Sequence, residues 1–227
     1  MDRRVLARYL IRETMGIVIV GVALFWAAGT LSWWPGWGLV ALTAGWVAGM
    51  TVVIVRFNPD MLADRLGARK QGERWDRVIM STVGISQLVR LVVAGLDERF
   101  GWTPGFPSSL QVAGLAAALL GYALVVWATA VNAHFSQIVR IQAERDHTVA
   151  TGGPYAWVRH PAYVGSIVNE LAVPLLLDSW WALIPGVLNA TLFVVRTALE
   201  DDTLKKNLAG YSAYAQEVSA RLVPGIW

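Results

Sequence analysis

The feature that most restricts the fold is a series of long apolar segments separated by short polar clusters. A transmembrane helix needs about 20 apolar residues to cross roughly 30 Å of hydrocarbon, and most of these segments approach that length. The charged fraction is 15%, well below the roughly 25% that is usual for a soluble domain. Residues 1–227 are therefore expected to form a single all-α domain, a polytopic membrane helical bundle.

The segments predict about six membrane spans. They lie at about Thr14–Leu31, Trp37–Val55, Val78–Leu96, Leu110–Ala133, Ala162–Leu177 and Trp181–Val195. The last two spans are expected to form a short helical hairpin with Asp178, Ser179 and Trp180 at its tip. Pro174 and Pro185 interrupt this hairpin, so it would either cross the bilayer with a tilt or kink or insert only partly.

The distribution of basic residues predicts the orientation. Of the 19 Lys and Arg residues, Arg90 lies inside the third span and Arg99 alone falls in a loop on the far side. The others precede the first span, follow the sixth, or lie in the loops around residues 56–77 and 140–159. By the positive-inside rule, both termini are expected to be cytoplasmic. The abundance of Ala, Gly, Val and Arg favours a prokaryotic inner (plasma) membrane.

Arg90 and the charged stretch Asn58–Asp76 do not have an obvious role from the sequence. Arg90 is either a functional residue, as intramembrane ionisable groups usually are, or an arginine near a helix end whose side chain extends to the headgroups. The stretch Asn58–Asp76 alternates acidic and basic residues and is expected to contain a short amphipathic helix at the membrane surface.

Several kinds of chemistry are disfavoured. The sequence has no cysteine, which excludes a thiolate nucleophile, disulfides and cysteine-based metal sites. Its three histidines have no carboxylate at ligand spacing, so no metal is expected. Glycine-rich nucleotide loops, zinc-protease motifs and serine-hydrolase elbows are missing from the sequence. The few charges within the spans argue against an ion or proton pathway.

A first polar cluster comes directly before the fifth span and reads TGGPYAWVRHPAY. Gly153 and Pro154 belong to a turn in which backbone can approach a ligand closely. Arg159 and His160 precede Pro161, which suits the first position of a helix, so their side chains would face a cavity together with free helix N–H groups. The alternative is an ordinary helix-start loop with an interfacial arginine.

A second polar cluster follows the sixth span and contains Arg196, Glu200, Asp201 and Asp202. On a helix, Arg196 and Glu200 lie one turn apart and can form an ion pair. Asp201 would then face another direction, where it could hold a cationic ligand. The alternative is a solvated, charged helix end.

In their order and spacing, the two clusters resemble the integral membrane methyltransferases of the isoprenylcysteine carboxyl methyltransferase and phospholipid N-methyltransferase superfamily. The matching positions are Gly153, Pro154, Tyr155, Arg159, His160, Pro161, Tyr163, Arg196, Glu200, Asp201, Leu204, Gly210, Tyr211, Tyr214, Pro224 and Gly225. The resemblance covers roughly residues 140–227, whereas residues 1–133 are similar to the family only in hydropathy. Asp201 stands where the family has glutamate, which makes its role the less certain of the two acids.

The resemblance implies S-adenosyl-L-methionine in a cytoplasmic pocket formed by residues 134–227, with spans one to four as the variable part. The implied cofactor-binding residues are Gly153, Pro154, Tyr155, Arg159, His160, Pro161, Tyr163, Glu200 and Asp201. Arg196 and Glu200 are the implied catalytic residues: Arg196 would orient an attacking carboxylate, or Glu200 would assist deprotonation of an amine or thiol. The substrate is expected to be a lipophilic, amphipathic or lipidated molecule that enters from the membrane lipid, and no nucleic acid is expected.

Three functions remain open from the sequence. The first is carboxyl O-methylation of an isoprenylated cysteine or a similar lipidated acid. The second is N-methylation of a phospholipid amine or S-methylation of a small thiol. The third is a non-catalytic membrane or transport protein on the same scaffold.

Overall fold

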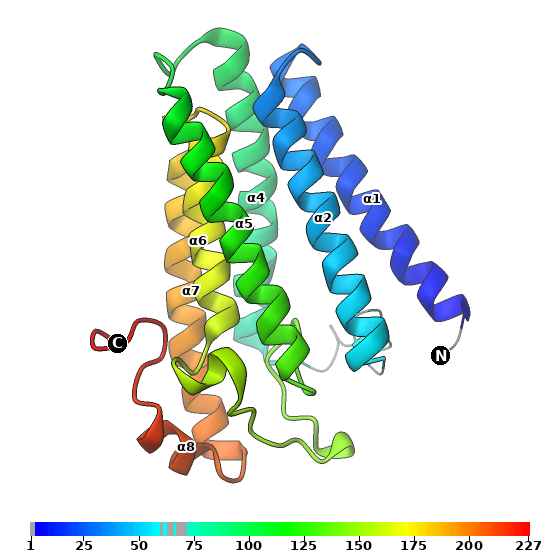
Figure 1. Ribbon diagram of the computed structural model, residues 1–227, viewed down its shortest axis with the longest axis vertical. Helices are drawn as coiled ribbons and strands as arrows, with labels where there is room; N and C mark the ends of the chain where they lie inside the picture. Colours follow the sequence, from blue (N-terminus) through cyan, green and yellow to red (C-terminus); the bar gives the residue numbers. More distant parts are fainter. Residues whose placement is uncertain (1–2, 60, 63–65, 67–71) are drawn as a thin grey trace.

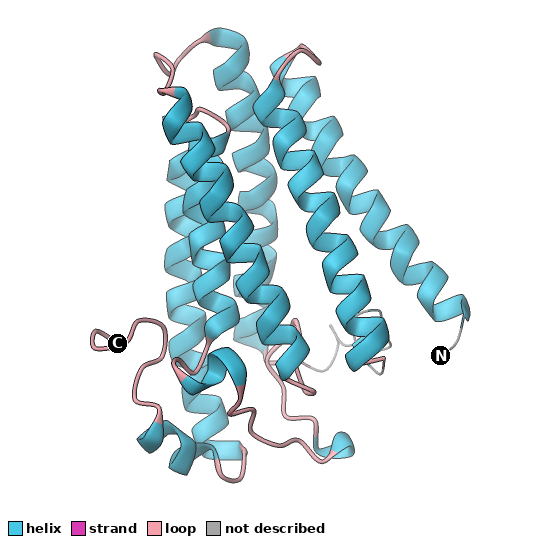
Figure 2. Ribbon diagram, in the orientation of Figure 1, coloured by secondary structure: helices cyan, strands magenta, loops and turns pink. Residues whose placement is uncertain are grey.

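The computed structural model describes residues 3–59, 61, 62, 66 and 72–227. Within these residues all regular structure is helical (Figure 2). The α-helices are α1 (Arg3–Ala28), α2 (Trp34–Phe57), α4 (Arg74–Phe100), α5 (Ser108–Val131), α6 (Pro161–Leu176), α7 (Trp180–Asn207) and α8 (Tyr211–Glu217), and the 3-10 helices are η2 (Ala143–Arg145) and η3 (Gly153–Ala156). The predicted all-α fold class is confirmed.

Six helices form the bundle, and five of them are long and apolar enough to cross a membrane: α1, α2, α4, α5 and α7. The sixth, α6, has 16 residues, which corresponds to a rise of about 24 Å. The start of α1, the loop between α5 and α6, and α8 lie at the same end of the bundle (Figure 1). We refer to this end, which also contains the last turns of α7, as the polar end.

Helix α7 continues beyond Val195, the expected end of the sixth span, to Asn207. Hydropathy falls at Arg196, but a helix requires only that its backbone can continue, and the sequence offers no glycine or proline between there and Gly210. Two charged side chains on the extension are buried and paired inside the protein: Arg196 is 4% exposed and Asp201 is 0% exposed. Of the predicted short hairpin, only α6 is short.

Helix α6 is packed closely between α5 and α7 by glycines. A Cβ atom at Gly165 of α6 would lie 2.4 Å from the carbonyl oxygen of Gly121 on α5. A Cβ atom at Gly186 of α7 would lie 2.5 Å from the carbonyl oxygen of Glu170 on α6. Small residues at membrane helix contacts allow backbones to approach in this way. Helix α6 is therefore held rigidly on both sides.

Arg90 lies in the interior of the bundle. Its side chain ion-pairs with Glu170 of α6 at 2.5 Å, and both residues are buried. The interpretation that Arg90 extends to the lipid headgroups is therefore wrong. Gln87 and Asn189 also donate hydrogen bonds to the carboxylate of Glu170, at 2.8 and 2.9 Å, so this polar group joins α4, α6 and α7.

The amphipathic helix expected within Asn58–Asp76 lies largely outside the described residues. Of its described part, Met61 and Leu62 are buried against Tyr9 of α1 and Ile54 of α2. These contacts attach the start of the segment to the polar end of the first two helices.

Candidate functional site

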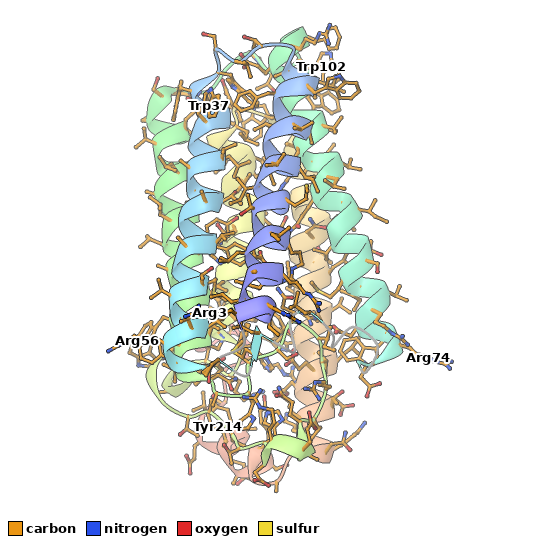
Figure 3. All side chains as sticks on the ribbon, turned by 90° about the vertical axis from the view of Figure 1, so that its right-hand side faces the viewer. Arg3, Trp37, Arg56, Arg74, Trp102 and Tyr214 are labelled. Atoms are coloured by element: carbon orange, nitrogen blue, oxygen red, sulfur yellow. The ribbon has the colours of Figure 1, made fainter. Side chains whose placement is uncertain are left out.

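A cavity of about 1030 Å³ runs from the polar end into the bundle. Its polar compartment is lined by the loop before α6, the start of α6 and the last turns of α7, including His160, Tyr163 and Glu200. The rest, which we call the apolar arm, lies between α1, α2, α4, α5 and α6, is lined mainly by apolar side chains and reaches Leu39 near the start of α2. Figure 3 shows Tyr214 of the polar compartment and Trp37 of α2 at opposite ends of the molecule. The cavity therefore extends along much of the bundle.

The two sequence clusters meet at Asp201 of α7. Arg159 donates to both carboxylate oxygens of Asp201, from Nε at 2.7 Å and from Nη2 at 3.1 Å. Arg221 Nε and the Tyr211 hydroxyl donate to it at 3.0 and 2.9 Å, and Lys205 Nζ lies 2.9 Å away. Asp201 has no exposed surface and does not line the cavity. Its charge is used to hold the protein's own cations.

Arg159 is in turn tied to the C-terminal segment. Its Nη1 donates to the carbonyl oxygens of Val218 and Ser219 at 2.6 and 2.7 Å. The backbone N–H groups of Arg159 and His160 donate to Ala220 and Arg221. Arg159 borders the cavity, but most of its donors are directed to the chain, so it fixes the C-terminal segment against the start of α6.

Four side chains with reactive or charged groups share the cavity wall: His160, Tyr163, Arg196 and Glu200. The Tyr163 hydroxyl donates a hydrogen bond to the Glu200 carboxylate. The Tyr163 ring stacks on His160 with centroids 5.7 Å apart, and the Arg196 guanidinium lies 5.1 Å from the Tyr163 centroid. Tyr163 therefore lies between a carboxylate, an imidazole and a guanidinium.

The expected ion pair between Arg196 and Glu200 is not formed. Arg196 Nε donates instead to Asp76 Oδ1 at 2.6 Å, and its Nη2 donates to Asp76 Oδ2 at 3.3 Å and to the Gln137 carbonyl at 2.8 Å. Asp76 is fully buried in the first turn of α4 and also accepts from Val139 N–H at 2.9 Å. The sequence analysis did not identify Asp76 as a site residue. The feature that could have indicated it is the position of an acidic residue at the start of an apolar helix.

The glycine–proline turn packs on α5 rather than on the cavity. Gly153 has φ +56°, and a Cβ atom there would lie 2.9 Å from Val131 and 3.2 Å from Trp127. Neither Gly153, Pro154 nor Pro161 lines the cavity. Pro161 begins α6 as expected, and the glycine is required by the backbone conformation and by its close contact with α5.

Tyr155, which follows this turn, does line the cavity and is buried. Its carbonyl oxygen accepts from the Tyr214 hydroxyl at 2.7 Å, and its own hydroxyl accepts from Asn132 Nδ2 at 3.3 Å. Burial raises the pKa of the Tyr155 phenol above its ordinary value. Tyr155 therefore presents a neutral aromatic wall to the polar compartment.

Two histidines that the sequence did not assign to the site also line the polar compartment. The rings of His134 and His147 stack with centroids 4.6 Å apart. Burial, followed by the neighbouring His134 and arginine charges, lowers the pKa of His147 to about 4. His147 Nδ1 accepts a hydrogen bond from the Gln142 N–H at 3.3 Å, which requires that nitrogen to be unprotonated. Burial also lowers the pKa of His134, so both rings are neutral at physiological pH.

These features define an integral membrane helical protein in which a polar compartment and an apolar arm form one cavity. Residues 113–206 match the sequence model of the isoprenylcysteine carboxyl methyltransferase (ICMT) family. This matched range contains both polar clusters up to Leu204. The resemblance to that family, inferred from the motifs, is confirmed over this part of the chain.

Three curated relatives are named protein-S-isoprenylcysteine O-methyltransferase. The chain is 44% identical to the one from Schizosaccharomyces pombe over 46 residues, which are 20% of each protein. It is 34% identical to the one from Tribolium castaneum over 79 residues (30% of this chain, 28% of the relative). For Rattus norvegicus the identity is 41% over 70 residues (30% and 24%). The matches thus span less than a third of the relatives' own length.

A solved structure shares the fold over the whole chain. It is described as the eukaryotic intramembrane Ras methyltransferase ICMT, and it superposes with a TM-score of 0.54 at 18% sequence identity. The superposition covers 100% of this chain and 88% of the other. Helices α1, α2 and α4, which precede the matched range, therefore also belong to a common architecture.

Proposed function

We propose that this protein transfers a methyl group from S-adenosyl-L-methionine to a lipophilic acceptor at the membrane. The observation that carries this proposal is the single cavity, in which the polar compartment around Tyr163 continues into an apolar arm inside the bundle. A water-soluble cofactor and a lipophilic substrate can meet in such a space while water is excluded. The names of the sequence relatives and of the solved structure support the same reaction class.

The residues of the polar compartment fit the proposed cofactor. When bound, S-adenosyl-L-methionine would supply an electrophilic methyl group on a sulfonium cation. The Glu200 carboxylate and the Tyr163 ring offer negative charge and a π face to a cation. Tyr155, with Leu204 and Leu208 of the cavity wall, offers an apolar surface to a purine, and His160 offers a ring nitrogen to a hydroxyl or carboxylate.

The other predicted cofactor residues have supporting roles in this proposal. Asp201 and Arg159 hold the C-terminal segment against His160. Gly153, Pro154 and Pro161 shape the entry to α6 and place Tyr155 and Tyr163 at the cavity. A substitution in this second group would therefore act through the shape of the pocket.

The geometry favours a carboxylate acceptor. Within the described part of the chain, Asp76 and Gln137 hold Nε and Nη2 of Arg196, which leaves Nη1 for the cavity. A guanidinium nitrogen in a site sheltered from water can orient an acceptor carboxylate for in-line displacement. Because Glu200 already accepts a hydrogen bond from the Tyr163 hydroxyl, it is poorly placed to deprotonate an amine or thiol. A carboxylate needs no such base at neutral pH.

The polar end is cytoplasmic in this proposal, and the protein lies in a prokaryotic inner membrane. Support for the orientation comes from Arg3, Arg56 and Arg74, which lie toward the polar end, whereas Trp37 and Trp102 lie at the opposite end (Figure 3). Basic residues on the cytoplasmic side and tryptophans at an interface are the usual pattern. The substrate would enter sideways from the lipid.

Calorimetry with S-adenosyl-L-methionine and the detergent-purified protein tests the cofactor. We expect saturable binding that Glu200→Ala and His160→Ala each weaken at least tenfold. The matched control is Asp202→Ala, since this neighbouring acid is exposed and pairs only at the surface with Lys206. Transfer of a labelled methyl group to S-farnesyl-thiopropionic acid, compared with a farnesyl thioether that carries an amino group in place of the carboxyl, then tests the acceptor. No binding to a well-folded sample would contradict the proposal.

A further inference from the structure

The apolar arm of the cavity contains polar atoms without hydrogen-bond partners among the described residues. They are Arg90 Nε, Asn169 Oδ1 and Trp46 Nε1, and each atom is itself buried. Arg90 and Asn169 are only 7% and 5% exposed, and all three residues line the cavity. They come from α4, α6 and α2, three helices that line the same cavity.

The structural ion pair of Arg90 does not account for these atoms. Its contact with Glu170 uses Nη1, which donates to the carboxylate at 2.5 Å and to the Glu170 carbonyl at 3.4 Å. Asn169 Nδ2 donates to the Gly165 carbonyl at 2.9 Å, which fixes the amide so that Oδ1 is the remaining acceptor. A polar atom left unpaired in the membrane interior is costly, so these atoms favour a hydrogen-bonding group of a ligand, or water that enters the cavity from the polar end.

The cavity-lining residues of α6 relate the position of Asn169 and Glu170 to that of Tyr163. Tyr163, Ser166 and Glu170 line the cavity from the same face of α6, at spacings of three and four residues. Seven residues separate Tyr163 from Glu170, which corresponds to a rise of about 10 Å. A molecule whose reacting group lies beside Tyr163 and whose apolar body follows α6 into the arm would pass directly by Arg90 and Asn169.

We propose that Arg90, Asn169 and Trp46 form a second polar subsite for a hydroxyl group on the apolar body of the substrate. This inference rests on the proposed function and specifies its substrate class as a lipophilic acid with an internal hydroxyl. The charge of Arg90 is already neutralised by Glu170, so the subsite suits an uncharged group. A hydroxyl accepts from the N–H groups of Arg90 and Trp46 and donates to Asn169 Oδ1, whereas a carbonyl would leave Asn169 unpaired.

The test compares matched long-chain acids. Hexadecanoic acid and its monohydroxy analogues, with the hydroxyl at successive positions, are titrated into the protein in lipid nanodiscs in the presence of S-adenosyl-L-homocysteine, which has no methyl group to transfer. We expect the analogue whose hydroxyl lies about 10 Å from the carboxylate to bind about tenfold more tightly than hexadecanoic acid. Analogues with the hydroxyl elsewhere should not show this gain.

Two conservative substitutions connect the preference to the subsite. Arg90→Lys keeps a cation for Glu170 but removes the Nε donor, and Trp46→Phe keeps an aromatic ring beside Tyr122 but removes the N–H. Each should reduce the preference for the hydroxy acid at least threefold and leave the affinity for hexadecanoic acid unchanged. Trp26→Phe is the matched control, since Trp26 is 79% exposed on α1.

Equal affinity for all the acids, including no measurable binding of any, would overturn the proposal. So would a hydroxyl preference that survives in both variants, or variants that weaken every acid equally, because those results describe a purely structural polar cluster. A failure of the proposed function is distinguished by a separate measurement. It would appear as absence of S-adenosyl-L-methionine binding, independent of the affinities for the acids.

Discussion

Replacing Asp76 with asparagine should impair the function of Arg196, although Asp76 itself does not line the cavity. Asp76 is 0% exposed and Arg196 4% exposed, and their closest atoms are 2.6 Å apart. Removal of one partner from a buried ion pair costs about 3–5 kcal/mol, since the other charge stays buried without compensation. The amide introduced by Asp76→Asn would keep one acceptor for Arg196 or for the Val139 N–H. We therefore expect a loss near the lower limit, about 3 kcal/mol in the free energy of unfolding.

The same substitution should lower turnover. Arg196 depends on Asp76 and Gln137 for its position at the cavity. A displacement of about 1 Å in a positioning group can reduce the rate about a hundredfold. Because Asp76 does not line the cavity and Glu200 and Tyr155 are not its hydrogen-bond partners, the affinity for S-adenosyl-L-methionine should change little. The combination of low turnover and normal cofactor binding would distinguish Arg196 as an acceptor-orienting residue.

A double-mutant cycle measures the interaction directly. Unfolding in mixed micelles, monitored by tryptophan fluorescence, gives the free energies of unfolding of Asp76→Asn, Arg196→Gln and the double variant. We expect the double variant to be about as stable as either single variant, because the second change removes a charge that is already unpaired. Glu73→Gln is the control, an exposed acid immediately before α4, with an expected effect within about 0.5 kcal/mol.

Two results would refute this reasoning. The first is a loss below about 1 kcal/mol for Asp76→Asn, which is typical of an exposed pair. The second is additivity of the two single variants, which would mean that Asp76 and Arg196 do not interact in the membrane-embedded protein.

Two further predictions concern packing and pH. Gly165→Val would place a Cβ atom 2.4 Å from the Gly121 carbonyl oxygen. We expect it to destabilise the α5–α6 contact by about 1–3 kcal/mol, which is measured as a fall in Tm. The control Gly16→Val, at an open position on α1, should not show this fall. His147 has a pKa lowered from 6.5 to about 4, so its contribution to stability is present above pH 6.5 and lost as the pH falls toward 4. Tm should therefore decline over that range, and a His147→Gln variant with an equal decline would contradict the assignment.

The sequence predicts the six helices of the bundle well because the preference of apolar side chains for the bilayer is local to each segment. It does not indicate that Arg196 and Asp201, which follow the sixth predicted span, are buried. Their burial depends on partners from distant segments, Asp76 for Arg196 and Arg159 for Asp201. No periodicity or local spacing encodes pairings 120 and 42 residues apart, because they exist only once the helices have packed.

The residues of the candidate site also divide into those that a local sequence motif indicates and those that only the packed structure brings together. Tyr155, His160 and Tyr163 line the cavity, and their motif could be found because it combines a turn with a helix start. The same motif overestimates Gly153, since a glycine required for positive φ and close packing has the same sequence signature as one that approaches a ligand. His134 and His147 were missed because an irregular loop brings them together, and loops of this kind follow no hydrophobic period.

In the proposed function, α6 and α7 set the reaction geometry. Phe193, Arg196, Glu200 and Leu204 line the cavity from one face of α7, at spacings of three and four residues. This face extends over about 16 Å and reaches from the membrane-embedded part of the cavity into the polar compartment. Because α7 is one continuous helix and glycine contacts hold α6 against it, the distance between a bound lipophile and a bound cofactor is fixed before either arrives. Such preorganisation is what direct displacement requires most, since the protein contributes mainly alignment and the exclusion of water.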